Sequence, residues 1–210
     1  MSITIVSAWT EEIEWFARKA NETKRRYAKK HGYQFACLKG NLSGDKWPHW
    51  SKVSLILAAM DCCDWVFWSD ADSFILNMEP KLEDYVDEQF DLIVSNHVIE
   101  PNRFSFNTGN IFVKSSDWSR KFWRSVLDKH PGHCDEQLVV NDMWNKSEEV
   151  KKRTKVIPKA DFNVLWDVQP GRPVSPHVMR FILHFAGTQR YIPWLFGRWK
   201  DDKLAQCKND

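Results

Sequence analysis

Two aspartates separated by one alanine, Asp70 and Asp72, are the residues whose type and spacing most suggest chemistry. They follow the apolar run "DWVFWS" (64–69), and apolar sequence resumes directly after them. Alternate residues at a strand end can point the same way, so both carboxylates can approach one cation. A hard cation such as Mg²⁺ or Mn²⁺ prefers such oxygen ligands, and a bound diphosphate can supply others. The competing interpretation is an ordinary strand-to-loop turn, in which aspartates satisfy backbone donors.

The elements around this pair predict a rigid support for it. A continuously apolar strand is covered on both faces, as in a parallel sheet flanked by helices. We expect strands at 3–8, 33–38 and 64–69, a helix capped by Thr10 that ends near His31, and a helix from about Trp50 to Asp61. This alternation favours an α/β fold, in which ligands bind at the carboxyl ends of the strands.

The second half of the chain has fewer clear patterns. We expect a short helix from Pro80, strands at 91–96, 110–114, 155–158 and 180–187, a helix capped by Ser115 or Ser116 that ends at Lys129, and a helix at 135–144. A mixed sheet would accommodate these elements.

The composition is that of a soluble globular protein, with 43% hydrophobic and 28% charged residues. A net charge of +2 predicts no strong polyanion-binding field, so we expect no nucleic-acid partner. The basic cluster is interpreted as the solvated face of a helix; its members are Lys24, Arg25, Arg26, Lys29 and Lys30.

Neither a bilayer-spanning segment nor a signal peptide is expected, because no uncharged apolar window is long enough and the N-terminus enters a strand-like run directly. The five cysteines lack the spacing of zinc ligands, which favours free thiols in a reducing compartment. Together these features predict a cytoplasmic location.

The segment "WSKVSLILAAMDCCDWVFWSDADSFILN" (50–77) resembles the central segment of GT-A-fold glycosyltransferases. It is most similar to the galactosyl, mannosyl and xylosyl transferases that form glycosyltransferase family thirty-four. Further motifs follow in family order: "NTGNIFVKSSDWS" (107–119), "DEQ" (135–137) and "HFAG" (184–187). The resemblance implies a GT-A, Rossmann-like fold with a mixed, mostly parallel sheet flanked by helices. It extends to virus-encoded members, such as chlorella-virus enzymes that glycosylate capsid protein.

The resemblance implies a metal site formed by Asp70, Asp72 and His184. An imidazole beside carboxylates favours Mn²⁺ over Mg²⁺, although Mg²⁺ stays an alternative. For His184 the competing interpretation is a core histidine on a strand.

The resemblance also implies contacts with a UDP- or GDP-sugar donor, made by Ser7, Ala8, Trp9, Lys52, Asp70, Ala71, Asn107, Gly109 and Gly187. Some of these assignments have open alternatives. Trp9 could stack on the nucleotide or simply cap the core, Lys52 could be an exposed helix lysine, and Asn107 to Gly109 could form a hairpin-type turn. The family lysine two residues after Gly187 is Gln189 here, and Arg190 could replace it.

The residues that match the family's reacting centre are Asp135, Glu136 and Gln137. One carboxylate would act as general base in an inverting enzyme, or stabilise an oxocarbenium-like centre in a retaining one. The family is retaining, but the sequence leaves the outcome open. Acids before an apolar helix also make a favourable first turn. The acceptor site could be shaped by Trp166, Asp167, Trp194 and Trp199.

The predicted function is a metal-dependent glycosyltransferase that moves a sugar to a hydroxyl of a glycan or glycoprotein. A single domain is expected, with a nucleotide-binding half at about 1–96 and an acceptor half at about 97–210. One alternative is a nucleotidyl- or phosphotransferase with the same metal-diphosphate site, although no P-loop pattern is present. Another is a non-catalytic carbohydrate-binding module, suggested by the twelve tryptophans.

Overall fold

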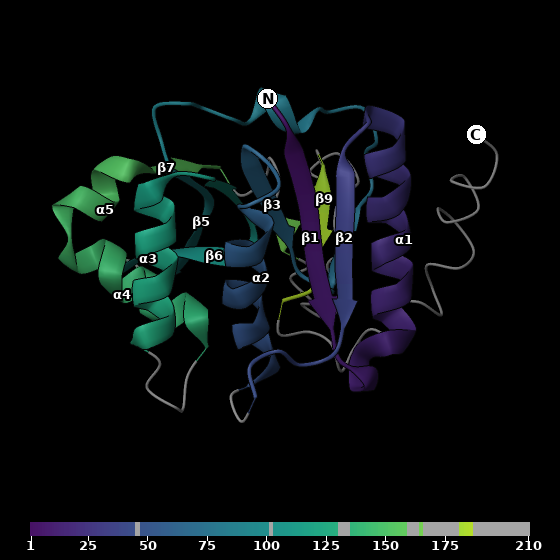
Figure 1. Cartoon of the computed structure of the whole chain (residues 1–210), viewed down its shortest axis with the longest axis horizontal. Coiled ribbons are helices and arrows are strands. Elements are labelled where there is room, and N and C mark those ends of the chain that lie inside the picture. The colour runs from purple at the N-terminus through teal and green to yellow at the C-terminus, as the bar shows by residue number, and fades with distance from the viewer. Residues whose placement is uncertain (45–46, 101–102, 130–134, 159–163, 166–180, 187–210) are drawn as a thin grey trace.

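The computed structural model describes residues 1–44, 47–100, 103–129, 135–158, 164–165 and 181–186. Its centre is a six-stranded sheet of order β2-β1-β3-β6-β5-β7 (Figure 1). These strands are β1 (Ile3–Trp9), β2 (Gln34–Lys39), β3 (Trp65–Ser69), β5 (Leu92–Glu100), β6 (Arg103–Lys114) and β7 (Thr154–Ile157). Strand β1 is parallel to β2 and β3, and β5 is parallel to β7, whereas β6 is antiparallel to both of its neighbours. The predicted mixed, mostly parallel sheet is confirmed.

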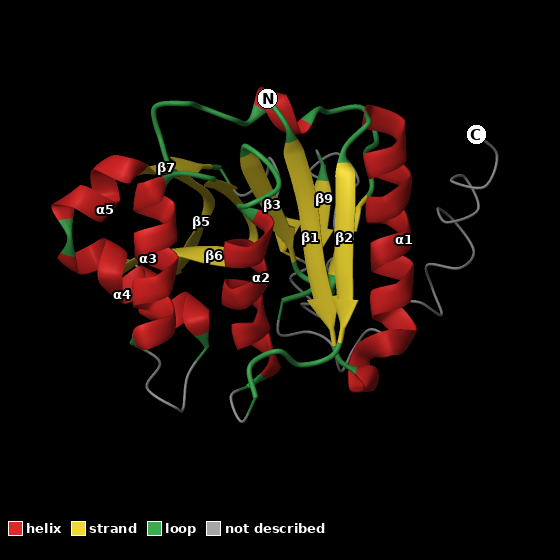
Figure 2. Ribbon diagram, in the orientation of Figure 1, coloured by secondary structure: helices red, strands yellow, loops and turns green. Residues whose placement is uncertain are grey.

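Helices cover the sheet on both faces. They are α1 (Glu14–His31), α2 (Ser51–Ala59), α3 (Asp117–Asp128), α4 (Glu136–Lys146) and α5 (Glu148–Arg153). In Figure 2, α2 lies in front of the sheet and α1 lies beside β2. Among the described residues, no helix has both the length and the apolar character needed to span a bilayer.

Strand β3 is buried along its whole length, because its side chains alternate between two cores. Val66 and Trp68 pack into the core covered by α2, α3 and α4, whereas Trp65 and Phe67 pack into the core covered by α1. This alternation between two covered faces explains why the strand is continuously apolar from Trp65 to Trp68. The strand therefore holds its carboxyl end, where Asp70 follows, in a fixed place.

The ends of the helices agree with the predictions in part. Ser116 caps α3 by accepting a hydrogen bond from the Ser119 N–H, and Gly32 ends α1 in a left-handed conformation with φ 78°. The cap predicted at Thr10 is wrong, since that side chain makes no capping bond and a 3-10 turn, η1 (Glu11–Ile13), precedes α1. The helix predicted from Pro80 is a 3-10 turn, η3 (Leu82–Asp84).

A second, three-stranded sheet of order β4-β9-β8 was not predicted. It contains β4 (Ser73–Ile75), β8 (Val164–Leu165) and β9 (Ile182–His184). Strand β4 is antiparallel to β9, with Ser73 opposite His184. Because β4 begins one residue after Asp72, this pairing brings His184 beside the aspartates.

The core around β3 yields a stability prediction. Phe67 is fully buried, with its ring centroid 4.5 Å from that of Phe112. We expect Phe67→Ala to lower the free energy of unfolding by about 3–5 kcal/mol, because it leaves a cavity between sheet and helix. Denaturant unfolding measures this, with the exposed Leu42→Ala as control, expected within about 0.5 kcal/mol of the unmodified chain. Equal effects of the two substitutions would contradict the assignment of Phe67 to the core.

Candidate functional site

Asp70 and Asp72 lie on a tight turn between β3 and β4. The Asp70 N–H donates to the Gly109 carbonyl at 2.7 Å, and the Ser73 N–H donates to the Asp70 carbonyl at 3.0 Å. The Phe185 N–H donates to the Asp72 carbonyl at 3.1 Å. The backbone of the turn is thus fixed against β6 on one side and the end of β9 on the other.

The side chains of Asp70, Asp72 and His184 converge, with one ligand atom from each lying within 4.8 Å of the others. His184 Nε2 is 3.1 Å from Asp72 Oδ1 and 3.7 Å from Asp70 Oδ2. Asp72 and His184 are buried, and Asp70 is partly exposed. Two carboxylate oxygens and one imidazole nitrogen form a donor set that fits Mn²⁺. The three residues predicted as metal ligands could therefore hold one divalent cation.

Gly109 provides the space that His184 occupies. A Cβ atom at position 109 would lie 2.1 Å from His184 Cε1 and 2.8 Å from Asn107 Oδ1, which is closer than atoms can approach. Asn107 Oδ1 in turn accepts a hydrogen bond from the Gly109 N–H. Both residues lie within β6, so the alternative of a hairpin-type turn at this position is wrong.

Lys52 lies at the centre of a buried ionic network. Its ammonium group is 2.5 Å from Glu136 Oε1, 3.2 Å from Asp70 Oδ1 and 3.0 Å from the Thr108 carbonyl. Its side chain is 4% exposed, so the alternative of an exposed helix lysine is wrong. Burial by itself would lower the pKa of Lys52, but the charges of Asp70 and Glu136 outweigh it and raise that pKa. The ammonium group therefore stays charged and is held between two acids.

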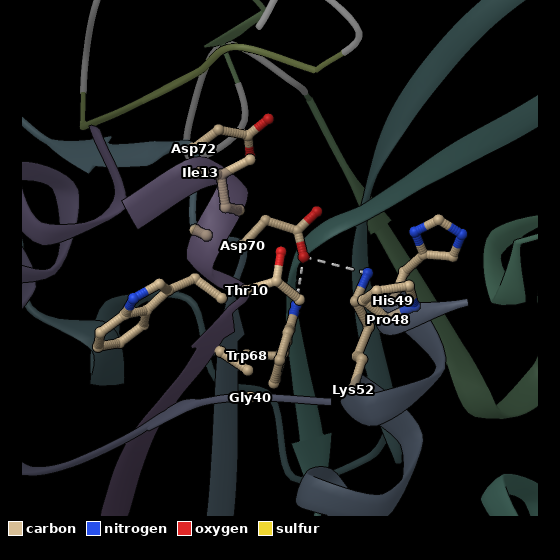
Figure 3. A pocket seen from close by; sticks show the side chains of 12 residues that line it. Thr10, Ile13, Gly40, Pro48, His49, Lys52, Trp68, Asp70 and Asp72 are labelled. Carbon is tan, nitrogen blue, oxygen red and sulfur yellow. Dashed lines mark hydrogen bonds and ion pairs between the residues drawn. The ribbon is translucent and has the colours of Figure 1, made fainter. Parts of the chain in front are cut away.

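The Asp70 carboxylate is oriented by the residues around it. Trp68 Nε1 donates to Asp70 Oδ1 at 2.6 Å, and Lys52 contacts the same oxygen. Figure 3 shows the carboxylate between these two side chains, with dashed lines to both. Asp70 Oδ2 is the oxygen nearer to His184. The two oxygens of Asp70 thus have different surroundings, one facing the network and the other the candidate metal site.

Lys24 is buried beneath the turn, so the predicted solvated face is wrong for this member of the basic cluster. Its ammonium group donates to the Asp70 carbonyl at 2.5 Å and to Ser7 Oγ at 3.2 Å. Burial lowers the pKa of Lys24 to about 7, against the opposing effect of Asp72 and Asp70. Helical periodicity could have found this residue, since Lys24 lies four residues from both Ala20 and Ala28, which are buried.

A pocket of about 320 Å³ opens beside the turn. Its walls come from the end of β1, the loop before α2 and the end of β3, and it is lined by Ala8, Trp9, Thr10, Ile13, Gly40, Pro48, His49, Lys52, Trp68, Asp70, Ala71 and Asp72 (Figure 3). Ser7 is fully buried and is absent from this lining. The pocket thus brings together Ala8, Trp9, Lys52, Asp70 and Ala71 from the predicted donor-binding set.

The three predicted residues of the reacting centre have different surroundings. Asp135 caps α4 by accepting a hydrogen bond from the Leu138 N–H, as a first-turn residue does. Glu136 is 2% exposed and binds Lys52. Gln137 Oε1 accepts a hydrogen bond from the Thr108 N–H at 3.0 Å. Glu136 and Gln137 are therefore held against β6, close to Lys52.

Some predicted site residues lie outside the described residues. Among them are Gly187 of the donor-binding set, together with Gln189 and Arg190. The tryptophans and the aspartate predicted near the acceptor, Trp166, Asp167, Trp194 and Trp199, lie outside them as well. Their roles stay predictions.

The close contact at Gly109 gives a prediction about metal binding. We expect Gly109→Ala to weaken Mn²⁺ binding by about tenfold to a hundredfold, because the added methyl group displaces the His184 imidazole. Isothermal titration calorimetry with Mn²⁺ measures this. In a His184→Ala background the same substitution should add little, since most of the clash is gone. An equal additional loss in that background, or unchanged binding in the single variant, would contradict this account.

The buried ionic network gives a second prediction. We expect Lys52→Met to lower the free energy of unfolding by about 3–5 kcal/mol, because it leaves the Glu136 carboxylate buried without its cation. The double variant Lys52→Met/Glu136→Leu should recover much of that loss. Denaturant unfolding compares these with Lys29→Met, an exposed lysine of α1. If Lys52→Met were as stable as Lys29→Met, the network would contribute nothing.

The sequence matches the model of the galactosyl transferase GMA12/MNN10 family over residues 3–105. The probable alpha-1,6-mannosyltransferase MNN10 of Saccharomyces cerevisiae is 22% identical, over 75% of this chain and 50% of the relative. The alpha-1,2-galactosyltransferase of Schizosaccharomyces pombe is also 22% identical, over 84% of this chain and 57% of the relative. The chain thus spans about half the length of the curated relatives that it matches.

Solved structures share the fold. A glycosyltransferase involved in the glycosylation of the major capsid of PBCV-1 superposes with a TM-score of 0.70 and 19% identity, over 92% of this chain and 100% of the other. The galactosyltransferase LgtC, solved with donor and acceptor sugar analogs, superposes with a TM-score of 0.58 and 13% identity, over 88% and 87%. The predicted GT-A fold is confirmed. The chain therefore has the GT-A fold and is similar in sequence to the galactosyl transferase GMA12/MNN10 family.

Proposed function

We propose that this chain transfers a sugar from a nucleotide-diphosphate sugar to a hydroxyl of a glycan or glycoprotein, with a divalent cation bound by Asp70, Asp72 and His184. The observation that carries this proposal is the convergence of these three side chains within 4.8 Å at the carboxyl end of β3, beside a pocket of about 320 Å³. Ligands of open α/β sheets bind at this edge, and pockets of this volume suit small molecules.

The charges around the turn support a cation site. Asp70, Asp72 and Glu136 bring three carboxylates, which Lys52 and Lys24 only partly balance. A bound divalent cation, Mn²⁺ by preference or Mg²⁺, would neutralise charge that develops on a departing diphosphate. Asp70 Oδ1 is engaged by Trp68 and Lys52, so we propose that Asp70 binds the ion through Oδ2.

The nucleotide is proposed to occupy the pocket between the end of β1 and the loop that carries Pro48 and His49. Trp9 lines this pocket, and its indole N–H is buried without a hydrogen-bond partner among the described residues. An orphan buried donor favours a ligand or a water nearby. UDP and GDP are both candidates for the nucleotide.

The names of the relatives support a proposal for the sugar and the acceptor. Their names specify mannosyl and galactosyl transfer, which supports a hexose donor. The PBCV-1 glycosyltransferase takes part in capsid glycosylation, which supports a glycoprotein acceptor. Glu136 and Gln137 come from the half of the chain expected to bind the acceptor, so we propose that α4 carries groups of the reacting centre.

The carbohydrate-binding module loses much of its support. Among the nine tryptophans in the described residues, four are buried in the core, namely Trp50, Trp65, Trp68 and Trp123, and only Trp15 and Trp47 are exposed. A module that binds sugars on its surface would need such rings exposed.

Thermal unfolding with a panel of nucleotide sugars tests the proposal. We expect one donor to raise the melting temperature in the presence of Mn²⁺ and not in EDTA, because a ligand at about 100 Kd adds about 2.7 kcal/mol to native stability. Asp72→Asn should abolish the shift, whereas the exposed Asp128→Asn should leave it unchanged. Mn²⁺-dependent release of the sugar from the same donor would then identify the transferase.

Three outcomes would contradict the proposal. If no donor raised the melting temperature, the proposed donor site would be contradicted. Sugar binding that survives both EDTA and Asp72→Asn would favour a carbohydrate-binding module. Nucleotide binding with phosphate or nucleotidyl transfer, and with no sugar released, would favour the phosphotransferase class.

A further inference from the structure

Part of β6 extends beyond the end of its neighbour β3. The pairing of the two strands ends where Ser69 lies opposite Asn110, yet β6 begins at Arg103. Backbone groups in this extension still need hydrogen-bond partners when they are buried. At Phe106 and Thr108 these partners are side chains.

Asn141 of α4 binds Phe106 as a neighbouring strand would. Asn141 Oδ1 accepts from the Phe106 N–H at 2.9 Å, and Asn141 Nδ2 donates to the Phe106 carbonyl at 2.9 Å. The same nitrogen donates to the Gln137 carbonyl, also at 2.9 Å. Asn141 is 8% exposed, and these bonds engage its oxygen and both of its amide hydrogens. All three of these hydrogen-bonding groups of the side chain are therefore used in the contact between α4 and β6 or within α4.

The spacing of helix and strand matches at this contact. Gln137, one turn before Asn141, accepts a hydrogen bond from the Thr108 N–H, two residues after Phe106. Four residues of helix rise about 6 Å, and two residues of strand rise about 6.6 Å. Two side chains on one helical face therefore reach two successive backbone groups of the strand.

The register of α4 on β6 determines where its first residues, Glu136 and Gln137, lie. Glu136 Oε1 accepts from Thr108 Oγ1 at 2.9 Å and binds Lys52 at 2.5 Å. A shift of α4 along β6 would break both contacts together with the bond from Gln137. Lys52 also contacts Asp70, so the position of α4 is connected to the aspartate turn.

We propose that Asn141 is a positioning residue, which fixes the register of α4 on β6 and thereby places Glu136 and Gln137 relative to the Asp70 turn. The catalytic consequence rests on the proposed glycosyltransferase function, whereas the structural placement does not. Asn141 itself touches no substrate in this proposal.

Amide hydrogen exchange, followed by NMR without any ligand, tests the placement. In Asn141→Leu we expect the amides of both Phe106 and Thr108 to exchange faster, by roughly tenfold each. Phe106 loses its hydrogen bond to Asn141, and Thr108 loses its bond to Gln137 because α4 no longer keeps its register on β6. In Gln137→Leu only the Thr108 amide should exchange faster. Asn145→Leu is the matched control, since Asn145 lies one turn later, is exposed and bonds only within α4 among the described residues; it should change neither amide.

Kinetics with the donor identified as above test the consequence. At a temperature well below unfolding, Asn141→Leu should lower kcat by about tenfold to a hundredfold and change KM for the donor much less, because Glu136 and Gln137 are displaced directly whereas the pocket is affected only through Lys52. The loss of kcat in the double variant Asn141→Leu/Gln137→Leu should be clearly smaller than the product of the two single losses, because both substitutions act on the same group. Asn145→Leu should keep the unmodified kcat.

The outcomes separate this inference from the proposed function. Unchanged exchange of the Thr108 amide in Asn141→Leu, or fully additive kcat losses in the double variant, would overturn the positioning role. A chain that transfers no sugar from any donor, but shows the expected exchange pattern, would overturn the proposed function alone. Asn141→Ser, which is too short to bridge both groups of Phe106, replaces the leucine variant if that variant does not fold, with the same expected pattern.

Discussion

The buried ammonium group of Lys52 is the contact on which the arrangement of the site depends. It binds Asp70 after β3, Thr108 in β6 and Glu136 in α4, so one charge ties three elements together. Taking that charge out of water is costly unless acids and carbonyls surround it. The cost is offset only when the three elements meet. The network therefore both stabilises their arrangement and determines the charges next to the aspartate turn.

The fold places that network at the edge of a rigid sheet. The burial of β3 on both faces fixes the end of the strand, and the turn that follows is held by Gly109 and Phe185 through backbone hydrogen bonds. His184 lies in β9 of the second sheet, and the pairing of β9 with the short strand β4 brings it beside the turn. A cation site built in this way needs little reorganisation when a ligand arrives, because its first ligands are already close.

The sequence predicted those parts that rest on local patterns. The central strands, the end of α1 at Gly32 and the capped helix after Ser116 follow from apolar periodicity and capping chemistry. Strand β4 has three residues, too few to show a period. The burial of Glu136 depends on Lys52, 84 residues away, and no local pattern reports such a contact. The burial of Lys24 follows from its place on the buried stripe of α1, whereas its charge alone predicts an exposed position.

The central claim is that Asp70, Asp72 and His184 bind one metal ion next to the donor pocket. Anomalous diffraction at the manganese absorption edge, from crystals soaked with Mn²⁺ and a nucleoside diphosphate, tests it most directly. The account predicts an anomalous peak within about 2.0–2.6 Å of Asp70 Oδ2, an Asp72 oxygen and His184 Nε2. A peak elsewhere, or no peak between these three side chains while the nucleotide is bound, would contradict it.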